Sequence, residues 1–109
     1  MFLMTKIYRY EYASLSITLL IVYSHMGNWG LIPILYLIPD ITALGFFIST
    51  KTGEKAYNLS HTLLLPLILL SINLITKSNN LFTSSMIIWL LHISIDRTLG
   101  WNLFPRKTM

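Results

Sequence analysis

The 109-residue chain contains no cysteine. This absence excludes disulfide bonds, thiolate zinc sites, iron–sulfur clusters and cysteine nucleophiles. Charged residues are also scarce, at 11% of the chain, whereas an average soluble domain has about 25%. Since 54% of the residues are apolar, the composition is typical of an integral membrane protein and leaves no room for a separate soluble domain.

Acidic residues are few, so the formal net charge is +4. A basic chain can bind nucleic acid when its cations form a patch or a stripe. Here the lysines and arginines stand at the ends of apolar runs, which is the pattern of membrane topology. We therefore expect the lipid bilayer as a partner and no nucleic acid.

The apolar runs predict an all-α fold, a four-helix transmembrane bundle that forms one domain over residues 1–109. The predicted spans are about 10–25, 30–48, 56–76 and 81–103, each near the ~20 residues that cross a bilayer. The first span lacks a small-residue cleavage site and is read as retained. Pro39 and Pro66 interrupt or bend the second and third spans, Asp40 is expected to cap the segment after Pro39, and residues 49–55 are expected to form a polar loop.

The distribution of basic residues predicts the orientation of the bundle. Cytoplasmic loops carry an excess of lysine and arginine. The predicted loops on the other side hold only Lys77. Both termini and the middle loop are therefore expected to be cytoplasmic. The basic residues on that side are Lys6, Arg9, Lys51, Lys55, Arg106 and Lys107.

The chemistry is concentrated in residues 89–97, where an apolar run also carries ionisable groups. His92 and Asp96 are four residues apart and share one helix face. Together with Asp40 and His61 they supply two imidazoles and two carboxylates, a set that suits zinc, manganese or iron. A bound ion with an open position can activate water for hydrolysis. The alternative is a polar network that holds the helices together without a metal.

Two further residues are candidates for catalytic roles. Glu11 can serve as a general base or ligand, or as an ion-pair partner at the start of its span. Arg97 can bind a lipid phosphate in a bidentate manner, extend to the headgroups, or pair with Glu11 or Asp96. Asn58 either orients His61 or caps the third span.

Three segments carry a resemblance to a known family. They are LIPDITALGF at 37–46, AYNLSH at 56–61 and IWLLHISIDRTLGW at 88–101. With Arg9 and Glu11, they closely resemble domain-of-unknown-function family 4260 of small bacterial membrane proteins. This resemblance implies four helices in the bacterial inner membrane but no established activity. The chain departs from the family at Tyr10 and Tyr12, where the family has Leu and Gly. It also departs after Pro105, where the family's extended C-terminal motif is truncated in this chain.

A weaker resemblance is to inner-membrane metal-dependent hydrolases of the YdjM type. That group also orders a Pro-Asp pair, a histidine in a following helix, then a histidine and an aspartate four apart. One histidine of that group has no counterpart here, since Ala56 and Tyr57 stand in its place. The matching positions are Pro39, Asp40, His61, His92, Asp96, Gly100, Phe104 and Pro105.

Three functions follow from these patterns. The first is a metal-dependent hydrolase that acts on a lipid or amphiphile, in which Asp40, His61, His92 and Asp96 hold the ion while Glu11 or Arg97 assists. The second is a small proton-linked transporter, which needs a homo-oligomer because four spans are few. The third is a non-catalytic membrane partner protein with a structural polar core.

Overall fold

The computed structural model describes residues 2–26, 29–76, 80–101 and 103–104. In these residues the fold is all-α, with four helical segments in chain order and no strand. The first segment is α1 (Phe2–Ser24) and the last is α5 (Asn80–Thr98). The second segment joins η1 (Trp29–Leu31), α2 (Ile32–Leu35) and the 3₁₀ helix η2 (Ile38–Phe47), and the third joins α3 (Thr50–His61) and α4 (Leu64–Thr76).

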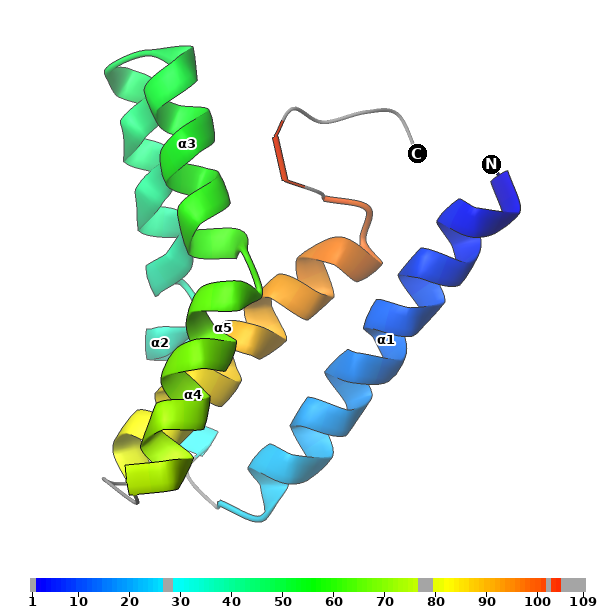
Figure 1. The fold of residues 1–109 in the computed structure, drawn as a ribbon, viewed down its shortest axis with the longest axis vertical. Helices are drawn as coiled ribbons and strands as arrows, with labels where there is room; N and C mark the ends of the chain where they lie inside the picture. Colours follow the sequence, from blue (N-terminus) through cyan, green and yellow to red (C-terminus); the bar gives the residue numbers. More distant parts are fainter. Residues whose placement is uncertain (1, 27–28, 77–79, 102, 105–109) are drawn as a thin grey trace.

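Helix α5 lies at the centre of the molecule, with α1 on one side and α4 on the other (Figure 1). The core is built mainly from α1 and α5, and its fully buried side chains include Tyr23 and Ile88. The α2 segment also packs against α5. The buried apolar cluster comprises Leu19, Tyr23, Ile87, Ile88, Leu90 and Leu91.

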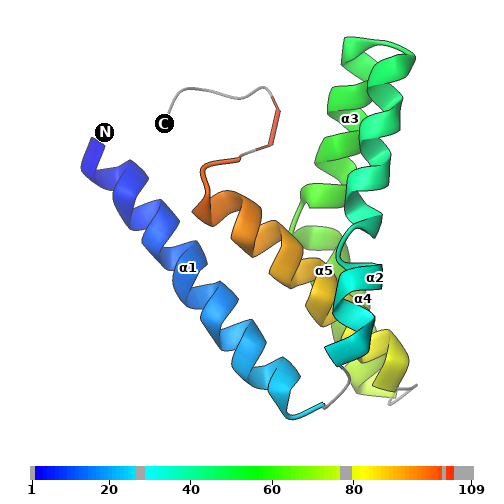
Figure 2. The ribbon, with the colours of Figure 1, turned by 180° about the vertical axis from the view of Figure 1, so that it is seen from behind.

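The hairpin of η2 and α3 projects beyond this core and is visible from both sides (Figures 1 and 2). Its two helices approach closely because each contributes a glycine to the contact. A Cβ at Gly45 would lie 3.2 Å from the Cα of Gly53, and a Cβ at Gly53 would overlap the Phe46 ring. Absence of side chains at these two positions therefore permits the tight packing of the hairpin.

The third segment differs from its prediction at both ends of α3. Residues 50–55 are helical rather than a polar loop, because the Ser49 hydroxyl accepts the Thr52 amide at 3.0 Å and caps the helix. The helix then breaks at residues 62–63. Pro66 does not bend a continuous helix at mid-span, since it lies in the first turn of α4, where proline is tolerated.

The second segment is broken rather than kinked. A short α2 ends at Leu35, and a 3₁₀ helix follows residues 36–37. Pro39 stands in the first turn of η2, where it needs no helical amide partner. Asp40 does not cap this helix, because Leu37 is the capping residue and no side chain supplies a cap. The carboxylate of Asp40 points instead into the site described below.

Two of the helical segments are long and apolar enough to cross a membrane. They are Trp29–Phe47 and Thr50–Thr76, with mean hydropathies of 1.7 and 1.8. Helices α1 and α5 also have 23 and 19 residues, but charged residues lower their hydropathy. The start of α1 and the tip of the η2–α3 hairpin lie toward one end of the molecule, and the starts of η1 and α5 lie toward the other, while α5 ends near mid-height (Figures 1 and 2).

Candidate metal centre

Two helix interruptions meet beside the middle of α5. Residues 36–37 separate α2 from η2, and residues 62–63 separate α3 from α4. An interrupted helix leaves backbone carbonyls without their usual amide partners. Side chains supply the missing donors here: the His92 imidazole reaches the Tyr36 carbonyl, and the Arg97 guanidinium reaches the His61 carbonyl. The interruptions thus bring ionisable side chains and freed backbone groups into one place.

The four predicted ligands converge at this point, and we call them the tetrad: Asp40, His61, His92 and Asp96. His61 Nε2 lies 3.3 Å from Asp40 Oδ1 and 3.4 Å from Asp96 Oδ2. His92 Nε2 lies 3.1 Å from Asp40 Oδ1 and 3.3 Å from Asp96 Oδ2. The two Nε2 atoms are 3.2 Å apart. The four donor atoms therefore face a common centre. Helices η2 and α3 each supply one of them, and α5 supplies two.

These separations match the edges of a tetrahedral coordination shell. Zinc binds nitrogen and oxygen ligands at about 2.0–2.1 Å, and a tetrahedron of that radius has edges of about 3.3–3.4 Å. Five of the six separations among the four atoms fall between 3.1 and 3.4 Å. The sixth joins the two carboxylate oxygens and lies within the 4.8 Å that bounds the whole set. Five edges therefore suit a small divalent ion, and the carboxylate–carboxylate edge sets how far the side chains must move to close around it.

Backbone carbonyls determine which imidazole nitrogens face the centre. His92 Nδ1 lies 2.5 Å from the Tyr36 carbonyl oxygen, and His61 Nδ1 lies 3.0 Å from that of Tyr57. A carbonyl only accepts, so His92 Nδ1 is the protonated nitrogen, and a neutral His92 ring then turns its Nε2 lone pair toward the tetrad. His61 Nδ1 also lies 2.7 Å from the Ser60 hydroxyl, which can donate or accept, so the Tyr57 carbonyl alone does not determine the His61 tautomer. Metal-binding histidines in proteins are oriented by the same kind of bond.

Electrostatics favours a cation at the centre of the tetrad. With neutral rings, two Nε2 lone pairs face each other and two carboxylates. With both rings protonated, two N–H groups of like charge face each other across 3.2 Å. A network without metal needs at least one extra proton on an Nε2 atom, whereas a cation interacts favourably with all four atoms at once.

The tetrad is shielded from solvent on all sides but one. The side chains of His61, His92 and Asp96 are 3%, 1% and 9% exposed, while that of Asp40 is 51% exposed. A buried carboxylate is costly unless it is paired, and Asp96 is paired with both imidazoles. Access to the centre is therefore on the side of Asp40.

Two tyrosines that the sequence reasoning did not select hold the imidazole rings in place. Tyr57 stacks on His61 with centroids 3.8 Å apart and planes 8° apart, and Tyr36 packs on His92 at 4.4 Å. Tyr57 stands four residues before His61, so its helical spacing was a usable signal. Tyr36 lies far from His92 in the sequence, and no sequence pattern indicated that contact.

Arg97 lies beside the tetrad but is not part of it. Its Nη1 donates to the Tyr12 hydroxyl at 2.6 Å and its Nη2 to the His61 carbonyl at 3.3 Å. Within the described residues it forms no ion pair with Asp96 or Glu11. Glu11 is exposed on α1 and outside the tetrad. Sequence reasoning therefore identified Arg97 as a neighbour of the site but not the tyrosine that anchors it.

Tyr12 packs against a second tyrosine, Tyr8, on the same face of α1. The rings of Tyr8 and Tyr12 have centroids 4.8 Å apart. Partial burial raises the pKa of the Tyr8 hydroxyl, while the nearby Arg97 charge acts in the opposite direction. Helix α1 thus supplies tyrosine rings and hydroxyls, rather than carboxylates, around the guanidinium.

Asn58 has a role that differs from both of its predicted ones. Its Nδ2 donates to the Phe104 carbonyl and its Oδ1 accepts the Phe104 amide, both at 2.6 Å. The Phe104 ring then contacts the Tyr57 ring at 5.2 Å. Asn58 therefore fixes the segment after α5 against α3, and Tyr57 connects that segment to His61.

Comparison with known proteins gives one match. Neither the curated proteins nor the solved structures include a match to this chain. The comparison with protein families matches residues 5–108 to a domain of unknown function. This range covers the tetrad and all of its supporting residues, and it confirms the family resemblance seen in the sequence. The chain is therefore a member of the DUF4260 family.

Proposed function

We propose that this chain is an integral membrane protein that binds one divalent metal ion at the tetrad and hydrolyses a lipid or another amphiphile. The set of five ligand separations between 3.1 and 3.4 Å carries the proposal. Zinc suits two nitrogen and two oxygen donors in a tetrahedral arrangement, and manganese and iron accept the same donor types.

Exposed apolar side chains support insertion in a bilayer. In the two apolar segments most side chains face outward rather than into a core. Soluble proteins rarely expose apolar patches of this extent. Interrupted helices are also tolerated at membrane depth where their freed carbonyls are bonded within the protein. Large exposed apolar residues of these segments include Ile34, Leu37, Ile41, Leu44, Phe47, Leu64, Ile72 and Ile75.

The residues around the tetrad suggest a division of roles. A metal ion held by the tetrad would lower the pKa of a coordinated water and polarise an ester or phosphate group. Arg97 can bind an anionic group of the substrate, because its planar guanidinium suits phosphate and carboxylate. Glu11 lies outside the tetrad, so its proposed part in proton transfer requires water or substrate between it and the centre.

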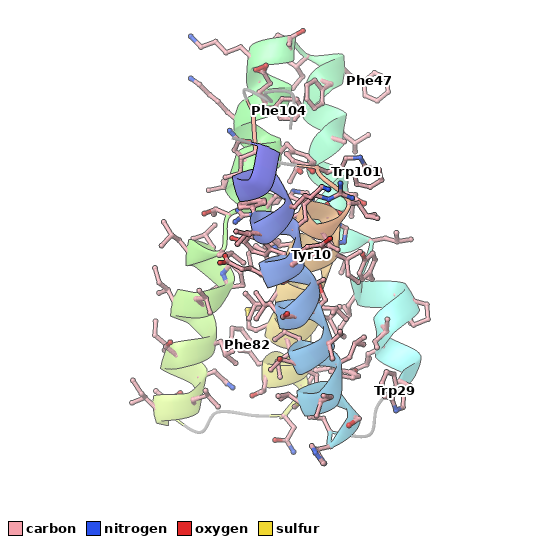
Figure 3. All side chains as sticks on the ribbon, turned by 90° about the vertical axis from the view of Figure 1, so that its right-hand side faces the viewer. Tyr10, Trp29, Phe47, Phe82, Trp101 and Phe104 are labelled. Atoms are coloured by element: carbon pink, nitrogen blue, oxygen red, sulfur yellow. The ribbon has the colours of Figure 1, made fainter. Side chains whose placement is uncertain are left out.

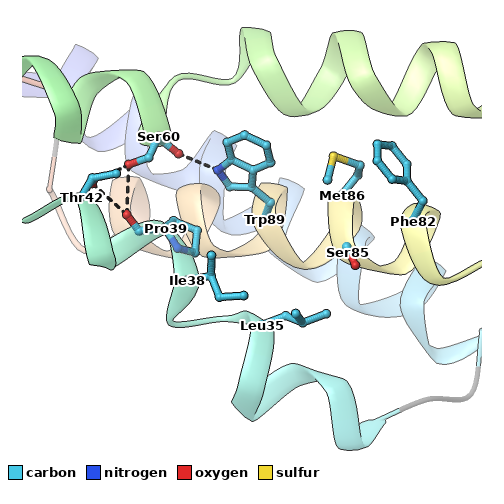
Figure 4. A pocket seen from close by; sticks show the side chains of 9 residues that line it. All are labelled: Leu35, Ile38, Pro39, Thr42, Ser60, Phe82, Ser85, Met86 and Trp89. Atoms are coloured by element: carbon cyan, nitrogen blue, oxygen red, sulfur yellow. Dashed lines mark hydrogen bonds between the residues drawn. The ribbon is translucent and has the colours of Figure 1, made fainter.

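An apolar cavity of about 470 Å³ lies next to the tetrad and could hold a hydrocarbon chain. Its floor is formed by α5, including Phe82 and Trp89 (Figure 4). Its polar end is formed by Ser60, whose Oγ lies 2.7 Å from His61 Nδ1. Ligand pockets of this size are usually apolar with a few polar groups. The arrangement therefore suits an amphiphile with its polar group toward the tetrad.

Metal analysis of the purified protein tests the proposal. Wild-type protein expressed in metal-replete medium should carry about one divalent ion per chain, and His92→Ala should carry close to none. His25→Ala is the matched control, because His25 is exposed in the turn after α1 and should leave the metal content unchanged. Wild-type protein without metal, or equal metal content in all three proteins, would contradict the metal site.

A separate assay tests hydrolysis. Metal-loaded protein in nanodiscs that contain radiolabelled phospholipid should release a labelled product, and His92→Ala should not. If the protein binds metal but releases no product from phospholipid, glycolipid or acyl-ester substrates, the hydrolase proposal is excluded and only metal binding remains.

A proton-linked transporter is the second candidate. The two interrupted helices beside an ionisable cluster favour it, since transporters place discontinuous helices at their binding sites. A substrate-dependent pH change in proteoliposomes, lost in Asp96→Asn, would support it. The third function, a non-catalytic partner with a structural polar core, predicts that His61→Gln and His92→Gln change stability alone.

A further inference from the structure

A second pocket lies away from the tetrad, between the start of α1 and the end of α5. It has a volume of about 340 Å³ and is lined by Lys6, Arg9, Tyr10, Ala13 and Thr98. Two of its five lining residues are cations, and none is acidic. Its charge therefore favours an anionic ligand.

Arg9 is held in a geometry that leaves its terminal nitrogens available. Its Nε donates to the Thr98 carbonyl at 2.7 Å, which anchors the guanidinium to the last turn of α5. This is the one hydrogen bond that the described residues make with Arg9, so Nη1 and Nη2 can donate to a ligand. A guanidinium that donates from two nitrogens matches a phosphate group. Lys6, one turn earlier, adds a second positive charge on the same side of α1.

The face of α1 that carries this pocket continues as an exposed apolar stripe. Ala13 is followed one turn later by Ile17, and then by Leu20 and Ile21. Ile17 and Ile21 are 60% and 57% exposed. From Arg9 to Ile21 the helix rises about 18 Å, which is close to the ~15 Å of one hydrocarbon leaflet. The basic pocket and the stripe therefore match the headgroup and the acyl chain of one lipid.

Tyr10 supports a position at the membrane surface. Its side chain lines the pocket and is 67% exposed. Tyrosines are enriched where headgroups meet the hydrocarbon core, because the ring is apolar and the hydroxyl is polar. A free phosphate would use Arg9 and Lys6 but would leave the apolar stripe uncovered.

We propose that Arg9 and Lys6 form a binding site for the phosphate of an anionic phospholipid, whose acyl chain lies along Ile17, Leu20 and Ile21. This site is independent of the tetrad and of any metal bound there. It assigns the amino-terminal part of α1 to lipid recognition.

Spin-labelled lipids provide the test, with intact protein in phosphatidylcholine bilayers. Motionally restricted signal should favour labelled phosphatidylglycerol over labelled phosphatidylcholine by several-fold. That preference should fall toward one in Arg9→Ala and in Lys6→Ala, and should fall partly in Arg9→Lys, which retains charge but not the two-nitrogen geometry. Lys51→Ala and Lys55→Ala remove the same charge from the hairpin and should retain the preference.

Further measurements separate the sources of phosphate and guard against unfolding. Inorganic phosphate at millimolar concentration should not displace the labelled lipid; full displacement would indicate a site for free phosphate and overturn the lipid assignment. Equal restriction of both lipids by the wild type, or equal loss in the lysine controls, would also overturn it. Because Arg9→Ala removes the bond to Thr98 and Lys6 also has an interaction within the protein, each variant counts in the comparison only when its melting temperature equals that of the wild type.

Discussion

At the residue scale, the tetrad depends on how its two imidazoles are held. Each ring has its Nδ1 within hydrogen-bond distance of a backbone carbonyl and faces a tyrosine ring. Both orientations are therefore set before any ion arrives, which lowers the entropic cost of binding. The Tyr36 carbonyl is available to His92 because the second segment is interrupted there, whereas the Tyr57 carbonyl lies in the last turn of α3.

Metal affinity should depend on pH with a definite sign. The tetrad coordinates an ion only when its imidazoles are neutral and its carboxylates ionised, so protons compete with the metal. We expect the affinity for zinc to fall as the pH is lowered, because protonation of an imidazole removes the lone pair that binds the metal. Competition with a chromophoric chelator at a series of pH values measures this. An affinity that rises on acidification would contradict imidazole coordination.

Asp96→Asn separates charge from shape at the same residue scale. Asparagine retains an oxygen but loses the negative charge that lies 3.4 Å from His61 Nε2 and 3.3 Å from His92 Nε2. Zinc affinity should fall by at least tenfold, with a smaller change in thermal stability. Asp40→Asn, at the exposed side of the centre, should have a weaker effect on folding because the Asp40 side chain is much less buried than that of Asp96. Unchanged affinity in both variants would exclude these carboxylates as ligands.

At the element scale, the η2–α3 hairpin positions two of the four ligands. Its tight packing depends on Gly45 and Gly53, and its base carries Asp40 and His61. The segment after α5 crosses the same hairpin through the two hydrogen bonds between Asn58 and Phe104. Phe104 lies beside the hairpin in Figure 3. The hairpin and the last segment are thus fixed to each other next to the tetrad.

Gly53→Ala should destabilise the hairpin, because the added methyl overlaps the Phe46 ring. Overpacking of this kind typically costs about 1–3 kcal/mol. Thermal unfolding followed by circular dichroism measures the loss. Phe46→Ala removes the ring that the added methyl would overlap. Phe46→Ala should therefore cost less stability in the Gly53→Ala background than in the wild type. Strictly additive effects would contradict the close contact between these two residues.

Asn58→Ala should release the segment that carries Phe104. The substitution leaves one amide and one carbonyl of Phe104 without their partners, and a lost buried partner costs about 1–3 kcal/mol. Asn58→Asp retains the acceptor but not the donor and should be intermediate. Protease sensitivity after Trp101 and zinc affinity are the two readouts. An affinity change without release of the segment would contradict the connection through Tyr57.

At the scale of the whole molecule, the proposed topology concerns which ends of the helical segments lie together. The start of α1 and the hairpin tip lie toward one end, and the start of α5 lies toward the other (Figure 1). A four-span bundle places the start of the first span and the turn between the second and third spans on one side, because each span reverses the direction of the chain. Membrane crossing by α1 and α5 is part of the proposal, since these helices carry charged residues.

Single-cysteine labelling tests the proposed topology without background, because the chain has no cysteine. Lys51→Cys lies at the hairpin tip and Asn80→Cys at the start of α5. An impermeant maleimide should label Asn80→Cys in spheroplasts and Lys51→Cys only after the membrane is opened. Labelling of both positions from the same side would contradict four spans.

The sequence predicted the helical class and the identity of the four clustered side chains, because apolar periodicity and residue chemistry are local properties. His92 and Asp96 were the most secure, since a spacing of four residues alone places them on one face. The approach of Asp40 and His61 was an expectation that depended on how separate helices pack.

Tertiary structure decided the features that sequence spacing does not contain. It interrupted the second and third segments beside α5, at residues 36–37 and 62–63. It also brought Tyr36 to the His92 imidazole and Tyr12 to the Arg97 guanidinium. The physical reason is that a helix determines its own faces through bonds between near neighbours, whereas contacts across distant parts of the chain depend on how whole helices pack and on which freed carbonyls a side chain can reach.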